Sequence, residues 1–263
     1  MVEQAYARKL AAAVFVRKSR LIIGLDLTAN LMGLDQRGKE AEKTRVEKKA
    51  LEVISQTADF AVAFKLNRHI VFPLGLFDGI PRVLDAIHDQ GLTAIMDCKL
   101  NDIGNTNSHI AKYYFDAGFD ALIANPLVGW EGGLDKVIES ARRRERGIIT
   151  LCYMSHPAAN EGYGLEVIVD KKKPEPLYRI FAERALRWNT DGVIVGATYP
   201  ERIKEIYGIL HDRVPIISPG IGAQGGGASE ARAAGASYVI VARSIVDAKD
   251  PAAAASQFAA DSK

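Results

Sequence analysis

Short apolar segments rich in β-branched residues recur along the chain, each bounded by a turn signal and most followed by a stretch with apolar residues at helical spacing. Segments that are hydrophobic at every position are typical of parallel strands buried on both faces. We therefore predict eight strands, at Leu21–Leu27, Phe60–Leu66, Thr93–Lys99, Ala121–Asn125, Gly147–Cys152, Gly192–Gly196, Val214–Ser218 and Tyr238–Ala242.

Eight strand-and-helix units predict an α/β fold, a closed (β/α)8 TIM barrel with an extra N-terminal helix. A doubly wound open sheet is the structural alternative. The extra helix is expected between Met1 and Arg17, where it would close the bottom of the barrel. The length of 263 residues suits one barrel of about 250 residues, so a single domain over residues 1–263 is expected.

The overall composition, 48% hydrophobic and 25% charged residues, is that of an ordered globular chain. The chain has 34 Lys and Arg against 32 Asp and Glu, and the resulting net charge of +2 favours neither nucleic acid nor a membrane surface as a partner. Two basic runs, Arg142–Arg146 and Lys171–Lys173, lack the interleaved aromatic residues that stack on bases. We expect both to be solvated helix ends or loops.

Cys98 and Cys152 are too few for a disulfide framework, and neither belongs to a cluster with metal-ligand spacing. The histidines also lack such spacing: His69, His88, His109, His156 and His211. We therefore predict a protein of the reducing cytoplasm without a metal site. The short apolar run Leu10–Val16 follows Glu3 and precedes Arg17-Lys18-Ser19-Arg20 without a small-residue cleavage site, which argues against a signal peptide. No run of about 18 apolar residues predicts a membrane span.

One long segment between predicted strands, Tyr153–Pro174, shows no clear periodicity. Loops of this length in a compact domain are usually functional, so we expect a lid over the barrel mouth.

The densest polar cluster lies at the end of the third predicted strand. Asp97 and Lys99 are two residues apart, so strand alternation points both side chains the same way, into the mouth of the barrel where barrel enzymes carry out their chemistry. Asp102 follows just before a helix that is expected to begin near Ile103. Taken alone, Asp102 is equally well explained as the cap of that helix.

Two further charges, Asp26 and Lys65, come at the ends of the first and second predicted strands. Buried charges at strand ends are costly unless they are paired, so these residues are expected to interact with Asp97 and Lys99. One interpretation is an ion-pair network that only closes the barrel mouth. The other is a partly desolvated site in which alternating charges keep a lysine acid poised beside a carboxylate.

A glycine-rich segment, Ser218–Gly226, contains the literal dinucleotide fingerprint Gly-x-Gly-x-x-Gly. In a dinucleotide-binding unit this motif follows the first strand, whereas here it follows the seventh. Barrels often bind a phosphate in the loops after strands seven and eight, and Arg243 follows the eighth. The segment is therefore better interpreted as a binding site for a phosphate monoester than as the NADP site of an oxidoreductase.

Six segments, in the same order, resemble the orotidine 5′-monophosphate decarboxylase family. They are Asp26, Lys65, Asp97-x-Lys99-x-x-Asp102-Ile-x-Asn-Thr106, Met154-Ser155-His-Pro157, the glycine segment with Gln224, and Arg243-Ser-Ile245. The resemblance covers nearly the whole chain, and the Asp-x-Lys-x-x-Asp-Ile-x-Asn-Thr string is its most specific part.

The resemblance implies a cofactor-free decarboxylation of orotidine 5′-monophosphate (OMP) to uridine 5′-monophosphate (UMP) and CO2 in de novo pyrimidine biosynthesis. It also implies a homodimer, in which Asp102 and Thr106 reach into the partner's site. By the same match, Lys65, Asp97, Lys99 and the partner's Asp102 form an alternating charged array, with Lys99 the proton donor to C6 of the pyrimidine.

Implied substrate contacts follow in the same way. Asp26 and Lys65 would hold ribose hydroxyls, Ser155 the edge of the base, Pro219 its face, and Gln224 and Arg243 the phosphate. One departure is Ala242, because the family commonly has glycine before the phosphate arginine. Its backbone N–H is retained, so the phosphate contact is expected to persist.

Two rival functions follow from the same residues. A related sugar-phosphate decarboxylase or aldolase would act through Mg2+, but such enzymes carry a carboxylate ligand where this chain has Lys65, and an ammonium cannot ligate Mg2+. A barrel that only binds a nucleotide would not need Lys99.

Overall fold

In the computed structural model, which describes residues 4–169 and 173–263, parallel strands form a closed barrel in the order β1-β10-β9-β8-β5-β4-β3-β2. The barrel strands are β1 (Leu21–Leu25), β2 (Ala61–Asn67), β3 (Thr93–Leu100), β4 (Ala121–Ala124), β5 (Gly147–Tyr153), β8 (Gly192–Val195), β9 (Ile216–Pro219) and β10 (Tyr238–Val241). Each overlaps one of the eight predicted segments. The predicted (β/α)8 barrel is confirmed, and the open-sheet alternative is wrong.

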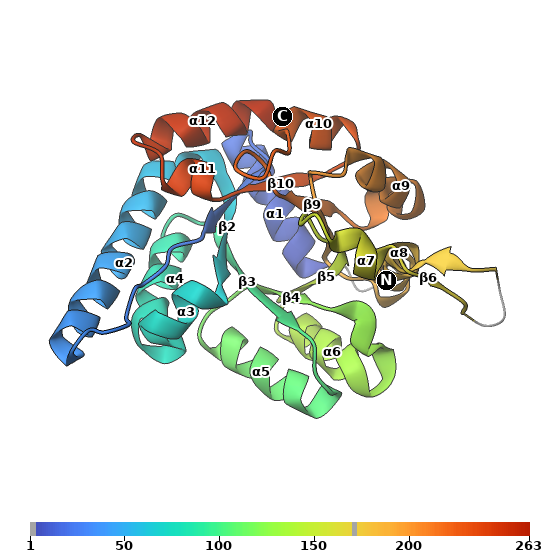
Figure 1. The fold of residues 1–263 in the computed structure, drawn as a ribbon, viewed down its shortest axis with the longest axis horizontal. Helices are drawn as coiled ribbons and strands as arrows, with labels where there is room; N and C mark the ends of the chain where they lie inside the picture. The colour runs from blue at the N-terminus through green and yellow to red at the C-terminus, as the bar shows by residue number, and fades with distance from the viewer. Residues whose placement is uncertain (1–3, 170–172) are drawn as a thin grey trace.

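Helices surround the barrel (Figure 1). They are α1 (Ala5–Arg17), α2 (Gln36–Thr57), α3 (Arg68–Leu74), α4 (Ile80–His88), α5 (Gly104–Asp116), α6 (Asp135–Arg143), α7 (Ala159–Tyr163), α8 (Leu177–Trp188), α9 (Pro200–Leu210), α10 (Ala228–Ala233), α11 (Arg243–Val246) and α12 (Pro251–Asp261). Helix α4 illustrates the packing: Ile80, Val83, Leu84 and Ile87 are buried, and this spacing turns one apolar stripe toward the strands.

The apolar core has two layers, one inside the barrel and one between the strands and the helices. The alternation of side chains along each strand divides them: in β5, Ile149 and Leu151 belong to the inner layer, whereas Ile148 and Cys152 belong to the outer one. Both layers are filled with buried side chains, which explains why the strands are hydrophobic at every position.

Helix α1 closes the bottom of the barrel, as predicted. Its Tyr6 and Leu10 side chains are fully buried in the inner layer with residues of the barrel strands. The Tyr6 ring lies directly against Gly147, where an added Cβ atom would be only 2.6 Å from a ring carbon. Asp191, just before β8, accepts from Ile148 N at 3.0 Å and lies beside the backbone N–H groups of Tyr6 and Ala7 at the start of α1.

The segment Tyr153–Pro174 contains more regular structure than its sequence suggested. It includes the short helix α7 and strand β6 (Glu166–Val167), which pairs antiparallel with β7 (Glu175–Pro176). This hairpin projects from the barrel at the right of Figure 1. Lys171 and Lys172 of the second basic run lie outside the described residues, and the lid function of the segment stays a prediction.

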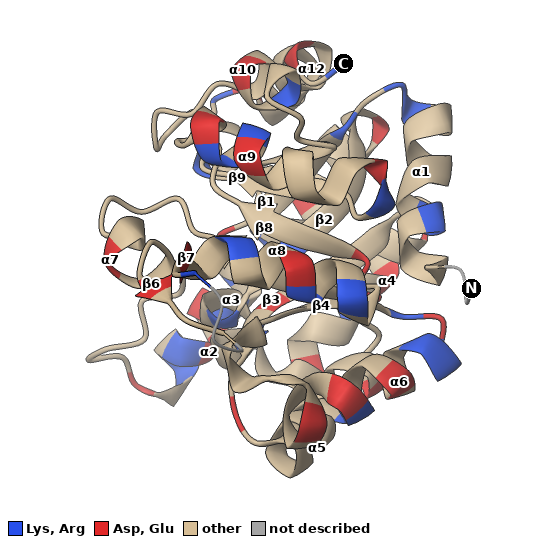
Figure 2. Ribbon diagram, turned by 90° about the vertical axis from the view of Figure 1, so that its right-hand side faces the viewer, with Lys and Arg blue, Asp and Glu red and all other residues tan. Residues whose placement is uncertain are grey.

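The first basic run, Arg142–Arg146, lies at the end of α6, as predicted, but it is not merely solvated. Arg142 donates to the carbonyl of Trp188, Arg144 pairs with Asp116, and Arg146 pairs with the buried Asp120. Figure 2 shows acidic and basic residues mixed on the helices of this side of the barrel. Among the described residues, no helix is long and apolar enough to span a membrane.

Candidate active site

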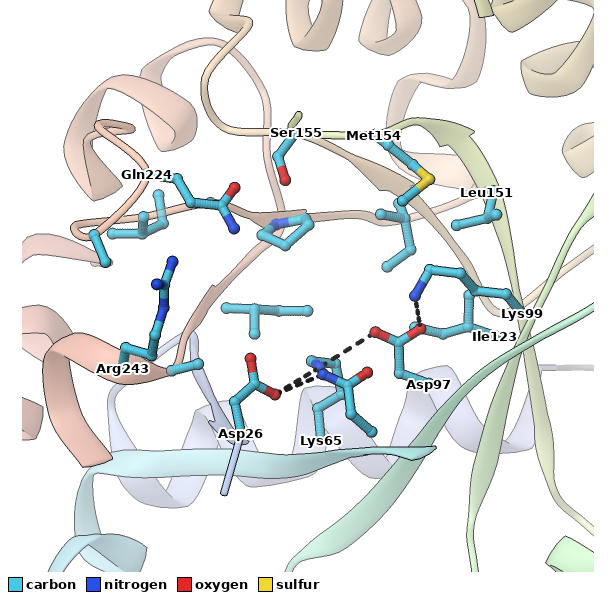
Figure 3. A pocket seen from close by; sticks show the side chains of 18 residues that line it. Asp26, Lys65, Asp97, Lys99, Ile123, Leu151, Met154, Ser155, Gln224 and Arg243 are labelled. Atoms are coloured by element: carbon cyan, nitrogen blue, oxygen red, sulfur yellow. Dashed lines mark hydrogen bonds and ion pairs between the residues drawn. The ribbon is translucent and has the colours of Figure 1, made fainter. Parts of the chain in front are cut away.

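A pocket with a volume of about 210 Å³ opens at the carboxyl ends of the barrel strands (Figure 3). Nine of the residues selected from the sequence line it: Asp26, Lys65, Asp97, Lys99, Ser155, Pro219, Gln224, Ala242 and Arg243. The other two, Asp102 and Thr106, do not. The strand-end charges therefore surround a cavity and do not simply fill the barrel mouth.

The charged residues form a continuous chain along one wall of the pocket. Lys65 Nζ lies 3.3 Å from Asp26 Oδ1 and 3.2 Å from Asp97 Oδ2. Lys99 Nζ lies 2.5 Å from the other oxygen of Asp97, Oδ1. Asp97 therefore bridges the two lysines, and charges alternate from Asp26 to Lys99.

Burial and charge act against each other on these groups. Burial alone lowers the pKa of Lys65, but the carboxylates of Asp97 and Asp26 outweigh it and leave that pKa above its usual value. Burial raises the pKa of Asp97, whereas Lys65 and Lys99 lower it, and the net direction is downward. Asp97 is therefore a carboxylate held ionised in a mostly buried position.

Lys99 reaches the pocket through an irregular stretch of strand. Its φ of 48° lies in the left-handed region, which is uncommon for a residue with a side chain, and the pairing between β3 and β4 shifts register between Met96 and Leu100. Simple strand alternation predicted the right destination for Lys99 but not this backbone conformation. Such irregularities next to a pocket often redirect a side chain.

Two sets of lining residues were not predicted from the sequence. Asn67, the last residue of β2, donates from Nδ2 to Asp26 Oδ1 at 2.7 Å. The second set is apolar: Ile123, Leu151, Ile194 and Ile240 belong to the inner layer of the barrel, and Met154 and Ile221 complete the set. The polar spacing Lys65-x-Asn67, which places both side chains on one face of β2, is the signal that could have identified Asn67.

The opposite end of the pocket is suited to an anion. Arg243 and Gln224 lie across the pocket from Asp97 and Lys99 (Figure 3). Within the described residues, no carboxylate lies within ion-pair distance of the exposed Arg243 guanidinium. Arg243 also begins α11, and the first N–H groups of a helix have no acceptor within it.

The glycine segment forms a tight loop beside Arg243. Gly220, Gly222 and Gly225 have φ values of 96°, 71° and 91°, which strongly favour glycine. The loop is closed by hydrogen bonds from Gly226 N to Gly220 O at 3.0 Å and from Gly222 N to Gly226 O at 2.9 Å. It follows β9, the seventh strand of the barrel, and so has the position of a barrel phosphate site and not that of a dinucleotide fingerprint.

Ala242 is accommodated by a glycine on the neighbouring strand. A Cβ atom added to Gly24 of β1 would lie only 2.8 Å from the Ala242 Cβ atom. The methyl group of Ala242 thus occupies space that the absent side chain at position 24 leaves open.

Ser155 is held over the pocket by close backbone packing. A Cβ atom added to Gly196 would lie 2.6 Å from Ser155 Cα, and one added to Gly220 would lie 2.9 Å from Ser155 Cβ. Thr198 Oγ1 donates to the Ser155 carbonyl at 3.0 Å. The Ser155 side chain points toward the pocket in Figure 3.

Asp102 and Thr106 lie on the outer side of the strand ends. Asp102 is exposed, and its Oδ1 accepts from the N–H of Ile103 at 2.7 Å. Ile103 is itself the N-cap of α5, and no side chain caps this helix. The helix-cap interpretation of Asp102 is therefore wrong. Asp102 instead lines an outer groove with Lys99, Arg68, Phe72 and Tyr113.

Within the described ranges, no group of three or more His, Cys, Asp or Glu side chains is placed to hold a metal ion. Both cysteines are free and buried, and burial raises the pKa of Cys98 to about 12.

A barrel with a charged pocket at its strand ends and a glycine loop after the seventh strand is typical of barrel enzymes that act on phosphorylated substrates. Residues 19–258 match the model of the orotidine 5′-phosphate decarboxylase / HUMPS family. The chain therefore belongs to this family, and the predicted resemblance is confirmed.

Individual relatives agree with this assignment. The orotidine 5′-phosphate decarboxylase of Pyrococcus abyssi is 41% identical over 209 residues, which cover 80% of this chain and 90% of the relative. That of Methanococcoides burtonii is 31% identical over 239 residues, covering 91% and 95%. Both relatives are named as decarboxylases, which are carboxy-lyases.

Solved structures share the fold over nearly the whole chain. The orotidine 5′-monophosphate decarboxylase of Methanocaldococcus jannaschii, solved with the inhibitor BMP, superposes with a TM-score of 0.74 at 25% identity, covering 92% of this chain and 98% of that one. The Pyrococcus horikoshii enzyme gives a TM-score of 0.70 at 33% identity with the same coverage of 92% and 98%.

Proposed function

We propose that this protein decarboxylates OMP to UMP and CO2, a step of pyrimidine biosynthesis, without a cofactor or metal ion. The observation that carries the proposal is the alternating chain Asp26, Lys65, Asp97 and Lys99 on one wall of a pocket whose far end presents Gln224 and Arg243. Membership of the family and the names of the relatives support the choice of substrate.

The pocket offers a matching contact for each part of this nucleotide. The phosphate binds Arg243, Gln224 and N–H groups near the glycine loop, because a guanidinium and backbone donors suit a dianion. The ribose hydroxyls bind Asp26 and Lys65. The base lies between Ser155 and Pro219, which directs its C6 carboxylate toward Asp97 and Lys99.

The chemical step breaks the bond between C6 and its carboxyl carbon. The electron pair stays on C6, and CO2 leaves. No carbonyl or imine next to C6 accepts this charge, so the site must stabilise it electrostatically. Lys99 supplies a cation beside C6 and then transfers a proton from Nζ to that carbon, forming UMP.

Asp97 and the apolar wall act on the same step. The Asp97 carboxylate lies next to the substrate carboxylate and favours departure of neutral CO2. Ile123 and Leu151 line the pocket nearby and keep water from the reacting carbon. Charge interactions are stronger in such a low-dielectric environment.

Remote binding energy at the phosphate serves catalysis as well. We propose that phosphate binding favours closure of the Tyr153–Pro174 segment over the substrate, which excludes water from the pocket. Energy from a group that does not react then raises the rate and does not only tighten binding.

We further propose a homodimer in which Asp102 and Thr106 complete the partner's site. Apolar side chains are exposed around Asp102: Phe72 at 72%, Ile103 at 69% and Tyr113 at 51%. The outer groove, which Phe72 and Tyr113 line together with Asp102, shares Lys99 with the pocket. Such a patch beside an incomplete site is typical of a protein interface.

The interface is tested by Ile103→Glu, which places a charge in this patch. The expected result is a monomer in sedimentation velocity with greatly reduced decarboxylation. Phe15→Glu is the matched control, since Phe15 is 76% exposed at the end of α1, at the bottom of the barrel. A variant Ile103→Glu that stays dimeric and active would contradict the proposed interface.

The activity is tested by following the ultraviolet absorbance of OMP with purified protein in excess EDTA. Conversion to the UMP spectrum that is abolished by Lys99→Ala, in protein whose circular dichroism is unchanged, is the expected result. A folded dimer that leaves OMP unchanged would refute the proposal. Activity that requires Mg2+ would instead favour a metal-dependent relative.

We also propose that the enzyme acts in the cytoplasm, which its two free cysteines support.

A further inference from the structure

The loop that carries Asp102 is short and fixed at both ends. It runs from the end of β3 at Leu100 to the start of α5 at Gly104. At its first end, the Leu100 carbonyl accepts from Asn125 N at 2.8 Å, and Leu100 pairs with Ala124 in the sheet. What holds the second end determines where Asp102 lies.

Asn107 on α5 makes that second attachment. Its side chain is fully buried although it is polar. Its Oδ1 accepts from Asp102 N at 3.1 Å, and its Nδ2 donates to Asp102 O at 2.5 Å. One amide therefore binds both backbone groups of Asp102 and leaves the carboxylate free of it.

The amide is itself anchored to a rigid support. Asn107 Nδ2 also donates to the carbonyl of Gly133 at 3.3 Å, in the turn η4 (Trp130–Leu134). Helix α5 meets this turn at very close range, because a Cβ atom added to Gly104 would lie 2.8 Å from Gly132 O. The helix start and η4 thus form a closely packed frame that Asn107 links to the Asp102 backbone.

We propose that Asn107 is a positioning residue that holds Asp102 in the conformation in which it enters the partner's active site. This inference rests on the proposed function, because it assigns Asn107 a role only through Asp102. Asn107 does not line the pocket of its own subunit, and its effect is delivered to the other subunit.

The physical reason is that the Asn107 amide keeps the backbone groups of Asp102 from forming other hydrogen bonds. Without Asn107, the N–H and carbonyl of Asp102 must find water or other groups, and the loop gains alternative conformations. Misplacement of a catalytic group by about 1 Å costs on the order of 100-fold in rate. We therefore expect Asn107→Ala to lower kcat/KM by about 10- to 100-fold.

Two variants separate positioning from a general loss of structure. Asn107→Asp keeps the shape of the side chain but turns a carboxylate oxygen toward the carbonyls of Asp102 and Gly133, so it should also impair the enzyme. Ser108→Ala is the matched control: the Ser108 hydroxyl bonds only within α5, to Gly104 O at 2.6 Å, and its loss should leave kcat/KM nearly unchanged.

Mixed dimers isolated with two affinity tags provide the decisive experiment. In a dimer of one Lys99→Ala subunit and one Asn107→Ala subunit, the live Lys99 receives Asp102 from the subunit that retains Asn107. That site should have wild-type kcat/KM. In a dimer of wild type with the double variant Lys99→Ala/Asn107→Ala, the live site receives the poorly held Asp102 and should show the full loss.

The reverse pattern, or equal loss in both dimers, would overturn the inference. So would a further loss from Asn107→Ala in a protein that already carries Asp102→Ala, because positioning has no effect once its target is gone. The proposed function fails separately, if wild-type protein does not decarboxylate OMP or if Lys99→Ala and Asp102→Ala subunits regain no activity when mixed.

Discussion

The side-chain amide of Asn67 donates to Asp26 Oδ1 at 2.7 Å, the same oxygen that lies 3.3 Å from Lys65 Nζ. Two donors therefore fix the orientation of this carboxylate, and its second oxygen remains for a ligand. A neutral amide achieves this without adding another charge to the pocket.

We predict that Asn67→Ala raises KM for OMP by about 10-fold, the value of one hydrogen bond to a charged group, with a smaller effect on kcat. The reason is that Asn67 orients Asp26, which is proposed to bind the ribose, so its loss weakens substrate binding. Lys99, which is proposed to act in the chemical step, remains in place. Steady-state kinetics measure the split. Gln257→Ala removes a comparable amide from the exposed face of α12 and should change neither constant. A loss confined to kcat would contradict this role for Asn67.

The second prediction concerns Arg243. Arg243→Ala should lower kcat/KM for OMP by several hundredfold or more, since a charge-assisted pair is worth about 1.5–3 kcal/mol and phosphate binding also promotes closure. The same change should barely affect turnover of orotidine, which has no phosphate. Competition assays with both substrates test this. Equal losses for the two would remove Arg243 from the phosphate site.

The third prediction concerns the packing of α1 in the barrel. Gly147→Ala should destabilise the protein by about 1–3 kcal/mol, because the new methyl group would press on the buried ring of Tyr6. Thermal unfolding measures the loss. Gly208→Ala, in α9 with no atom within 4 Å of an added Cβ, should instead leave the melting temperature unchanged or raise it. An unaffected Gly147→Ala variant would show that α1 is loosely seated.

The fourth prediction is a pH dependence of stability. Burial raises the pKa of Asp191 to about 6, although N–H groups of Ile148, Ala7 and Tyr6 partly oppose it. A carboxyl group with a raised pKa in the folded state binds its proton more tightly there than in the unfolded chain. The stability of wild type relative to Asp191→Asn should therefore rise as the pH falls from 7 to about 4, by up to about 3 kcal/mol.

Urea unfolding of the two proteins across this range measures the difference. Asp59→Asn is the control, because Asp59 is exposed and its ion pair with Arg17 lies at the surface. A gap between wild type and Asp191→Asn that stays constant with pH would contradict the prediction.

Much of the fold followed from the sequence because barrel strands must be apolar on both faces. The eight segments were therefore recognisable without any long-range information. The pocket residues on strand ends could be predicted as well, since the carboxyl ends of all strands in a parallel barrel lie at the same mouth. Asn67 and the isoleucines of the pocket wall were missed because an asparagine after a strand and an apolar residue within one are ordinary features.

The remaining differences have local causes. The positive φ of Lys99 depends on the shift in register between β3 and β4 beyond Met96, and the residue types in this stretch do not predict that shift. Asp102 resembled a helix cap because a carboxylate precedes the helix, but α5 begins one residue later than expected, at Gly104. The roles assigned to the lining residues, the single domain over residues 1–263 and the lid stay predictions.

The seating of α1 determines how molecules reach the reacting carbon. Tyr6 and Leu10 fill the lower end of the barrel together with inward-facing residues of its strands, so among the described residues the pocket opens at the carboxyl ends of the strands and not through the bottom of the barrel. In the proposed reaction, the nucleotide and CO2 therefore pass through the same opening. If the nucleotide is held by its phosphate during turnover, CO2 must leave past the bound product or after it. The closed lower end of the barrel therefore determines the order in which the two products can depart.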